Sequence, residues 1–522
     1  MAYEDSDLTA TESAQLQSYL TNSHGRTFAL RNLPEVVKGA LFSRYSRTEK
    51  SLRRVLLDEF LPLLEADSEP TANAATAVAD QRAEEFYQRV LVGYGDDSVA
   101  ELAGAHLAIE QVSTLAAKAL EDSRIGISPL EKSTRYVRFD RRNAAGNFAY
   151  YRGPELTHPT YISTLDALFQ TYSDLLPPLI QSIRDRYPLE EGENQAGWKS
   201  ATRAKALDLI RGLLPAATLT NLGLFGNGRA FEYLLTKLAA SELPECVELA
   251  PELHQELAQV IPAFVRRALD ERYGEPAIKR LRELRQHTIT LAPPRSEPIA
   301  GDRIRLIEYN PRAEAIVAAA ALFPFSDQPL DGLELEEGRV GQVLTTLLTG
   351  RGNRRHKLPR ALEQADYTFE LVASYAAYRD LHRHRMVSQQ RQLLGSTLGY
   401  ELSPELSEYG IQEQVNSALE QAGAAHRRLT ADLGPELAQY VVPLTYRMRW
   451  YIKANLREIY HLCELRSTPQ GHPEYRWLAQ EMFRQVQAVH PRLTANHLVD
   501  FSSGAELERR AAERRQAERA AK

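Results

Sequence analysis

Residues 213–235 have the sequence LLPAATLTNLGLFGNGRAFEYLL, and residues 440–462 have the sequence YVVPLTYRMRWYIKANLREIYHL. Three positions align at one spacing, Pro215 with Pro443, Asn227 with Asn455, and Arg229 with Arg457. A looser pair of similar stretches precedes them in the same order, at residues 26–42 and 302–323. Such self-similarity indicates two diverged copies of one unit. The alternative is a shared helix-rich architecture, in which the matched residues only mark a turn and a polar helix face.

Composition limits the function classes. The chain has 522 residues, a length that favours two domains, and its 43% hydrophobic and 25% charged residues are typical of a globular protein. The formal net charge of −6 argues against a broad nucleic-acid surface, which normally needs a basic face. Cys246 and Cys463 are too few for a disulfide framework or a cysteine metal site, and their scarcity fits a reducing compartment.

No targeting or membrane signal is evident. The start of the chain, MAYEDSDLTATES, is polar and acidic, so it lacks the cationic and apolar parts of a secretory signal. No uninterrupted apolar run reaches the roughly 18 residues of a membrane span. We therefore expect a cytoplasmic location and no membrane partner.

Breaks in the pattern divide the chain. The stretch TLAPPRSEPIAGD at 290–302 resembles a linker, and DRIRLIEYNP at 302–311 alternates like a strand before a turn. We expect an N-terminal domain over 1–290, a C-terminal domain over 291–503, and a charged tail over 504–522. Residues 189–198, LEEGENQAGW, are expected to form a surface loop.

Apolar residues three or four apart predict helices early in the chain. This pattern covers SLRRVLLDEFLPLLEA at 51–66 and VAELAGAHLAIEQVSTLAAKALED at 99–122. A similar helix-like stretch, FELVASYAAYRDL at 369–381, precedes the triplet Arg383-His384-Arg385. Side chains that fan around a helix end can hold a phosphate or the electron-rich edge of a flavin. A solvated helix terminus is the alternative.

These motifs resemble the flavin-dependent thymidylate synthases, which carry an Arg-His-Arg triplet, then a Glu-x-Ser-x-Arg-Tyr segment, and later a series of Pro, Arg, Asn-x-Arg and Leu-Arg. The C-terminal half resembles this family at Glu363, at the triplet, and along residues 443–466. The N-terminal half resembles it along Glu131 to Tyr136 and at the expected flavin-contacting start GDDSVAEL, with Ser98 and Glu101.

The two halves depart from the family in complementary ways. The C-terminal half has Arg391, Leu393 and Gly395 where the family has glutamate, serine and arginine. The N-terminal half keeps that segment, but it has Asp122-Ser123-Arg124 in place of the triplet. It also has Asn221 and Leu238 where the C-terminal half has Arg449 and Arg466. Because family members form sites where subunits meet, the resemblance implies one composite site between the two repeats.

The resemblance also implies a fold and a reaction. The fold would be α+β, as two fused flavin-dependent thymidylate synthase-like domains that are helix-rich with a small antiparallel sheet in each. Family members are homotetramers, so a homodimer of this chain would imitate them. FAD reduced by NADPH would give hydride to a uracil ring, and methylene-tetrahydrofolate would supply the methyl group that converts deoxyuridylate to thymidylate.

Site roles follow from matching positions. The catalytic residues would be Arg383, Ser133 and Arg466. The flavin would contact Ser98, Glu101, Glu363, Arg383, His384, Arg385, Asn455, Arg457 and His461. The nucleotide would contact Glu131, Ser133, Arg135, Arg449 and Arg466.

Three alternatives bear on the site. His382 and His384 point apart on a helix, and no cluster of His or acidic residues completes a ligand set with them, so we expect no metal. The substitutions in the C-terminal half leave open a flavin enzyme that acts on another pyrimidine nucleotide. The losses in both copies leave open a non-catalytic nucleotide-binding or scaffold protein.

Overall fold

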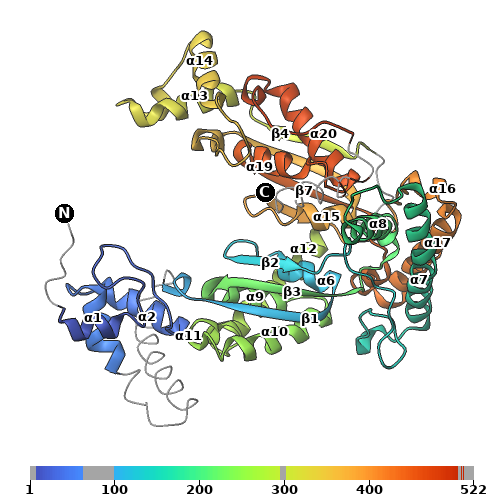
Figure 1. The fold of residues 1–522 in the computed structure, drawn as a ribbon, viewed down its shortest axis with the longest axis horizontal. Helices are drawn as coiled ribbons and strands as arrows, with labels where there is room; N and C mark the ends of the chain where they lie inside the picture. Colours follow the sequence, from blue (N-terminus) through green and yellow to red (C-terminus); the bar gives the residue numbers. More distant parts are fainter. Residues whose placement is uncertain (1–7, 63–98, 294–300, 504–506, 508–509, 511–522) are drawn as a thin grey trace. The chain divides into compact units, whose positions relative to one another are not determined.

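The computed structural model describes residues 8–62, 99–293, 301–503, 507 and 510 (Figure 1). These residues form many helices and two small antiparallel sheets. The expected α+β class, with a small sheet in each half, is therefore confirmed. Ser98, an expected flavin contact, lies outside the described residues.

The described residues divide into two compact units. Unit 1 is drawn from Met1–Val112, Ala116–Glu131 and Thr220–Pro294, and unit 2 from Ser113–Leu115, Lys132–Leu219 and Arg295–Lys522. Most of the middle of the N-terminal half thus packs in the same unit as the C-terminal half. Compact units need not coincide with sequence repeats. The border between the repeats near residue 290 therefore stays a prediction.

Unit 1 combines helices with a three-stranded sheet of order β1-β3-β2. Strands β2 and β3 pair antiparallel, from Ile127 opposite Gly226 to Glu131 opposite Leu222. The elements of this unit are α1 (Ala10–Leu16), α2 (Glu35–Tyr45), α3 (Leu52–Val55), β1 (Gly104–Ser113), α6 (Thr114–Glu121), β2 (Ile127–Glu131), β3 (Leu219–Asn227), α9 (Gly228–Ala239), α10 (Pro244–Leu257), α11 (Pro262–Val265) and α12 (Gly274–Leu291).

The helix expected over residues 99–122 is wrong for its first part. Residues Gly104–Ser113 form strand β1, and helix α6 begins only at Thr114. Two local features disfavour a helix here. A Cβ on Gly104 would lie 2.4 Å from the carbonyl oxygen of Gly226, so this position needs a glycine beside another strand. Gln111 has a φ of 57°, a left-handed conformation that a helix interior excludes.

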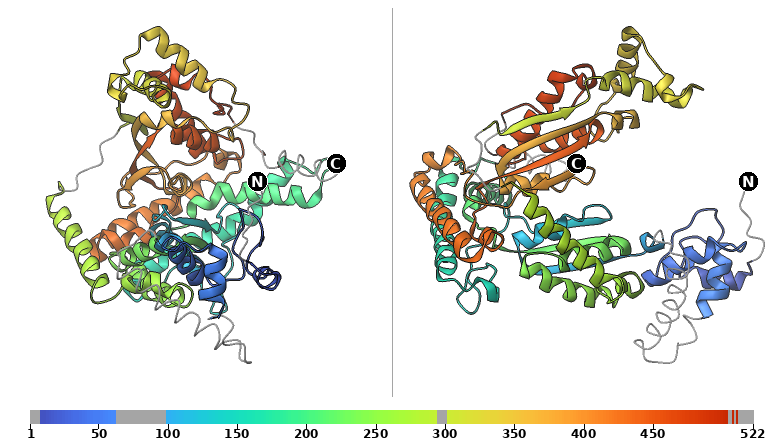
Figure 2. Two further views of the ribbon diagram at one scale, coloured as in Figure 1. Left: turned by 90° about the vertical axis from the view of Figure 1, so that its left-hand side faces the viewer. Right: turned by 180° about the vertical axis from the view of Figure 1, so that it is seen from behind.

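Unit 2 contains a four-stranded antiparallel sheet of order β4-β5-β7-β6. Long helices α7 and α17 pack side by side in it (Figure 1 and Figure 2). Its elements are α7 (Pro159–Arg186), α8 (Gln195–Ile210), β4 (Ile304–Tyr309), α13 (Ala313–Leu322), α14 (Glu337–Leu348), β5 (Asp366–Ser374), α15 (Tyr375–Leu381), β6 (Ser388–Arg391), α16 (Glu405–Glu408), α17 (Gln412–Leu433), α18 (Pro435–Ala438), β7 (Arg447–Asn455), α19 (Leu456–Arg466) and α20 (Pro473–Val489).

The sequence explains this sheet by alternation. On β5, Tyr367, Phe369 and Leu371 are fully buried, whereas the residues between them are less so. A period of two buries one face of a strand against the helices, and α20 packs against β4 and β5. The first part of the helix-like stretch 369–381 is therefore strand, and the helix that leads to the triplet is only α15.

Several boundaries expected from sequence have clear outcomes. Residues 304–309 of the expected strand 302–311 form β4, which confirms it. In the expected loop 189–198, Asn194 caps helix α8 by accepting hydrogen bonds from the backbone of residues 196 and 197, so the loop ends earlier than expected. Within the described part of the chain, no helix combines the length and apolar character needed to cross a membrane.

The duplicated stretches form the same element twice. Strand β3 leads into α9, and strand β7 leads into α19, with the same alternation of buried and exposed residues along both strands. Asn227 accepts a hydrogen bond from the backbone of Ala230 at 2.8 Å, and Asn455 accepts one from Glu458 at 3.0 Å. Each asparagine thus caps the helix that follows it, which is why both copies keep it.

The two copies also meet through equivalent backbone positions in unit 2. Pro215 and Pro443 face each other in an isolated antiparallel bridge. The backbone N–H of residue 216 donates to the carbonyl of 442 at 2.9 Å, and that of 444 donates to the carbonyl of 214 at 2.8 Å. These hydrogen bonds exchange when the two copies are interchanged. The contact therefore has a local two-fold symmetry of the kind found between identical subunits.

Candidate functional site

Four arginines of unit 2 gather around two aspartates, and we name this group the arginine cluster. It consists of Arg135, Arg211, Arg383 and Arg466 with Asp208 and Asp380. Arg135 donates to the two oxygens of Asp208 at 2.9 and 3.1 Å. Arg211, at the end of α8, lies 3.2 Å from Asp208 and 3.8 Å from Asp380.

Asp380 connects the triplet to this group. It lies on α15, three residues before Arg383, and its side chain is 19% exposed. Burial by itself raises the pKa of the Asp380 carboxyl, but the charges of Arg211, Arg383, Arg466 and Arg135 outweigh it and hold that pKa below its ordinary value. Positive charge from both repeats therefore acts on a single carboxylate.

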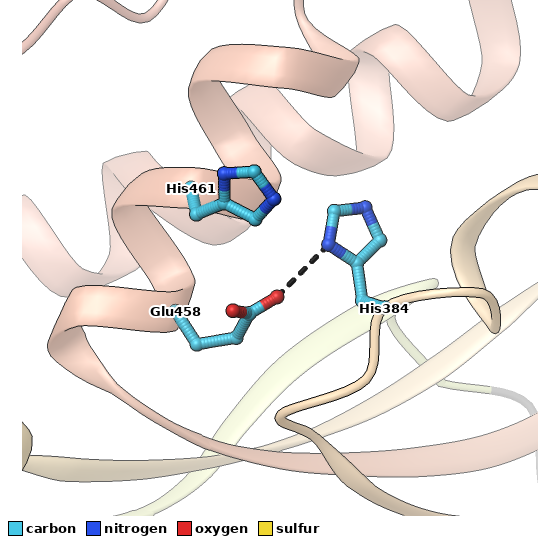
Figure 3. Close-up of side chains that lie close together, drawn as sticks. All are labelled: His384, Glu458 and His461. Carbon is cyan, nitrogen blue, oxygen red and sulfur yellow. Dashed lines mark hydrogen bonds and ion pairs between the residues drawn. The ribbon is translucent and has the colours of Figure 1, made fainter. Parts of the chain in front are cut away.

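His384 of the triplet lies beside Glu458 of helix α19 (Figure 3) and also contacts Arg466 at the end of that helix. Its Nε2 atom accepts a hydrogen bond from Nε of Arg466 at 3.0 Å, and its Nδ1 lies 2.9 Å from a carboxylate oxygen of Glu458. An arginine Nε–H can only donate, so Nδ1 carries the proton and donates to Glu458. Burial lowers the pKa of His384, and the charge of Arg466 adds to this effect. The imidazole is thus a neutral link that fixes the direction of Arg466.

The expectation that no cluster of His or acidic residues completes a ligand set is wrong, because the same histidine belongs to the one group of metal-ligand type found among the described residues. Ligand atoms of His384, Glu458 and His461 lie within 4.8 Å of one another (Figure 3). A metal on Nδ1 would displace the proton that this nitrogen donates, while Nε2 still has to accept from Arg466. Both ring nitrogens would then act as acceptors, which neutral imidazole cannot provide. The hydrogen bonds present favour the link to Arg466 over a metal site.

The expected flavin contacts of the C-terminal repeat lie on neighbouring elements. Arg457 donates to Glu363 at 2.6 Å and to the carbonyl of residue 358 at 3.0 Å. Asn455 caps α19 through its side-chain oxygen. The ring of His461 lies 5.5 Å from that of His384, and Arg385 is exposed.

Ser133 and Arg449, two expected nucleotide contacts, lie on different elements of unit 2. Ser133 is half-buried in the loop after β2, and its hydroxyl accepts a hydrogen bond from the backbone of Arg135 at 3.2 Å. Arg449 lies on β7 with its guanidinium 3.9 Å from Glu370 of β5. Ser133 is therefore held beside Arg135, whereas Arg449 lies next to an acid on the neighbouring strand.

Two further expected contacts belong to unit 1. Glu101 pairs with Arg229 at 3.0 Å, and both side chains are more than half exposed. Glu131 pairs with Lys118 at 2.8 Å, and neither side chain has any exposed surface. Lys118 also pairs with the buried Glu121. The carboxylate of Glu131 thus already has a charged partner inside unit 1.

A cavity of about 480 Å³ borders the arginine cluster, and its walls include Asp208 and Arg211. Arg303, also in the wall, pairs with Glu474 at 2.6 Å and lies 4.7 Å from the ring centre of Trp477. The cavity walls thus combine an aromatic side chain and internally paired charges with two members of the arginine cluster.

Comparison with known families gives this arrangement a context. The model of the family described as "Thymidylate synthase complementing protein" matches residues 53–263 and again 305–492, which together exceed half of the chain. The chain belongs to this family. The two separate matches agree with the duplicated arrangement that the sequence indicates.

Relatives of the thymidylate synthase complementing protein family differ in how much of the chain they match. A Chlamydia muridarum protein named UPF0159 protein is 43% identical over 94% of this chain and 95% of its own length. The flavin-dependent thymidylate synthase of Geobacter sulfurreducens is 30% identical over 37% of this chain and 84% of its own length. A Helicobacter pylori flavin-dependent thymidylate synthase solved with FAD and dUMP matches 38% of this chain and all of its own, at 21% identity and a TM-score of 0.29.

In this member of the thymidylate synthase complementing protein family, four residues of the site were not predicted from the sequence. They are Asp208, Arg211, Asp380 and Glu458. Arg211 lies four residues before the duplicated Pro215, and Asp380 lies three before the triplet, so proximity to those motifs was the available signal. Asp208 and Glu458 are single acids on helices, a pattern that is common without any role.

Proposed function

We propose that this chain binds FAD and a nucleoside monophosphate next to each other in unit 2. With NADPH and methylene-tetrahydrofolate as co-substrates, it would methylate deoxyuridylate to thymidylate. The observation that carries the proposal is the arginine cluster, because its guanidinium groups come from both repeats and gather in one unit of one chain. The relatives named as flavin-dependent thymidylate synthases support the same reaction.

The cluster has the chemistry of a phosphate site. A guanidinium presents several N–H groups in a fixed fork that suits phosphate oxygens, and it stays charged even where burial lowers its pKa, as at Arg466. Arg211 is 5% exposed, and its Nε and Nη2 atoms have no hydrogen-bond acceptor among the described residues. Donors without acceptors in a partly dry site favour an anionic ligand.

The remaining residues would position the partners of the reaction. Arg135 and Ser133 would contact the nucleotide, with Arg383 and Arg466 on its other side. Glu363, Arg457, Asn455, His461 and Arg385 would hold the flavin. Reduced FAD supplies hydride to the pyrimidine ring when it is bound. His384 would keep the guanidinium of Arg466 directed at the pyrimidine carbonyl through the hydrogen bond that it accepts.

The test begins with the flavin. The purified chain, supplied with FAD, should show a protein-bound flavin absorbance spectrum that NADPH bleaches without oxygen. Addition of deoxyuridylate and methylene-tetrahydrofolate should then produce thymidylate, detected by mass spectrometry. Arg466→Ala should abolish product formation, whereas Arg428→Ala, which removes an arginine 67% exposed on α17, should not. A protein that binds no flavin, or equal activity in these two variants, would overturn the proposal.

A second candidate keeps the flavin and changes the acceptor. It is favoured by Arg391, which stands in the register of the family's glutamate and donates to the hydroxyl of Tyr378 at 3.2 Å. The acceptor would then be another pyrimidine nucleotide. Parallel assays with uridylate, deoxycytidylate and deoxyuridylate separate the two candidates. Nucleotide binding without turnover of any of them would instead indicate a non-catalytic member of the family.

A further inference from the structure

The arginine cluster carries its own anions. Asp208 accepts two hydrogen bonds from the guanidinium of Arg135 and lies 3.2 Å from Arg211. Asp380 lies 3.8 Å from the same Arg211. Both carboxylates are largely shielded, with side chains 15% and 19% exposed. A site that only had to collect negative charge would have no need of two buried acids beside its arginines.

Both acids are ionised at neutral pH. Burial alone would raise the pKa of Asp208, but His472, Arg211 and Arg135 bring it below the ordinary value, and the pKa of Asp380 is lowered by its arginines as well. The four guanidinium groups stay charged. Burial lowers the pKa of His472, so its imidazole adds no charge at neutral pH. Four cations and two anions therefore leave two positive charges in the cluster for a ligand to neutralise.

This balance matches one class of ligand. A phosphate monoester carries about −1.5 to −2 charges at neutral pH, so it neutralises the cluster. A terminal diphosphate carries about one more negative charge than a monoester, which the cluster cannot match, and an unmatched charge in a shielded site is costly.

Two buried polar atoms of the arginine cluster lack hydrogen-bond partners. Nη2 of Arg211 and Oδ2 of Asp380 are both buried, and neither has a hydrogen-bond partner among the described residues. Their separation of 3.8 Å is too long for a hydrogen bond between them. The donor of Arg211 is therefore held near the acid without being satisfied by it.

We propose that Asp208 and Asp380 are specificity-determining residues, which make the arginine cluster accept a phosphate monoester dianion and reject ligands with a terminal diphosphate group. The proposal rests on the proposed function in so far as the monoester is that of a nucleotide. It assigns the selection to charge balance and not to the size of the cavity.

The experiment uses inorganic phosphate and pyrophosphate as probes, because they differ in charge and carry no base. Isothermal titration of the full chain should show a preference for phosphate. Asp208→Asn and Asp380→Asn each remove one negative charge, so each should shift the ratio of the two affinities roughly tenfold toward pyrophosphate. Glu413→Gln, which removes an equal charge from an exposed position on α17, should leave the ratio unchanged.

Asp208→Asn also breaks the contact with Arg135 and can destabilise the fold. Asp380→Asn, whose acid makes only the longer contact, is therefore a second and independent variant. An unchanged ratio in the folded Asp380→Asn chain would overturn the proposal, and so would a wild-type chain that binds neither probe. Failure of the proposed function is distinct, because the phosphate preference and its loss in the variants would then persist without flavin binding or turnover.

Discussion

Equivalent helices of the two repeats end in opposite ways. Helix α6 and helix α15 both begin by donating a backbone hydrogen bond to the segment before a duplicated strand, at residues 218 and 446. Near the end of α6, Lys118 holds Glu121 and Glu131 in a triad that is at most 1% exposed. Near the end of α15, Asp380 lies 3.8 Å from Arg211, and Nη2 of Arg211 and Oδ2 of Asp380 have no hydrogen-bond partner among the described residues. The charges at the end of α6 thus pair with one another, whereas the end of α15 lies in the arginine cluster, where we propose that a ligand binds.

The largest expected effect tests where the composite site lies. Arg135 and Asp380 belong to one unit of one chain, so Arg135→Ala and Arg383→Ala each abolish the site in the chain that carries them. Mixing the two inactive chains should restore no thymidylate formation after denaturation and joint refolding. Wild-type protein taken through the same refolding is the control. Recovery to a substantial fraction of wild-type activity would place the partners on different chains.

The closed triad should matter for stability. Lys118→Met leaves two buried carboxylates without a counter-ion, and loss of one member of a buried ion pair costs about 3 to 5 kcal/mol. Urea unfolding should show this loss, and the triple change with Glu121→Gln and Glu131→Gln should recover most of it. Lys279→Ala, which breaks a pair at a side chain 78% exposed, should cost almost nothing. A Lys118→Met protein as stable as the Lys279→Ala one would contradict the comparison.

Flavin affinity should differ between variants of the Arg383 triplet and variants of the matching residues in the first repeat. Arg383→Ala removes a charged donor from the triplet and should weaken FAD binding roughly ten- to hundredfold, since such hydrogen bonds contribute about 1.5 to 3 kcal/mol. Arg124→Ala, at the matching position of the diverged triplet, is the paired variant and should have little effect. Fluorescence titration with FAD measures both. Equal and negligible losses would remove the assignment.

The acids of the cluster predict a pH dependence. The pKa of Asp208 is lower in the folded chain than in the unfolded one, so its stabilisation is complete above the unfolded pKa of about 4 and is lost as pH falls further. Wild type should therefore exceed Asp208→Asn in unfolding free energy by about 2 kcal/mol at pH 7. The difference should shrink between pH 4 and pH 2. A gap that widens in acid would show the opposite sign.

The smallest effects should be equal in both repeats. Asn227→Ala and Asn455→Ala each remove one helix cap, at a cost of about 1 kcal/mol, and urea unfolding measures both losses. Asn227→Ser and Asn455→Ser, which keep a capping oxygen, are the controls. Clearly unequal losses would mean that the copies differ in their helices as well as in their charges.

Local sequence rules made the duplicated strand and helix elements predictable. A strand that ends at an asparagine cap shows in sequence as a fixed spacing, so the duplicated elements were visible at Asn227 and Asn455. The strand at Gly104–Ser113 was missed because small apolar residues fit a helix period equally well, and only pairing with β3 decides between them. Asp208 and Asp380 could not be recognised because their role depends on arginines far away in the chain.

The reciprocal hydrogen bonds near Pro215 and Pro443 have an evolutionary consequence. In a pair of identical subunits, such a contact must be self-complementary, so any substitution occurs on both sides at once. Here Gly212 and Tyr440 occupy matching positions, as the hydrogen bonds from residues 445 and 217 to their carbonyls indicate. A Cβ on Gly212 would lie 3.0 Å from that of Thr445, while Tyr440 is buried and stacks on Tyr151. Fusion has let one side of the contact become small and the other large.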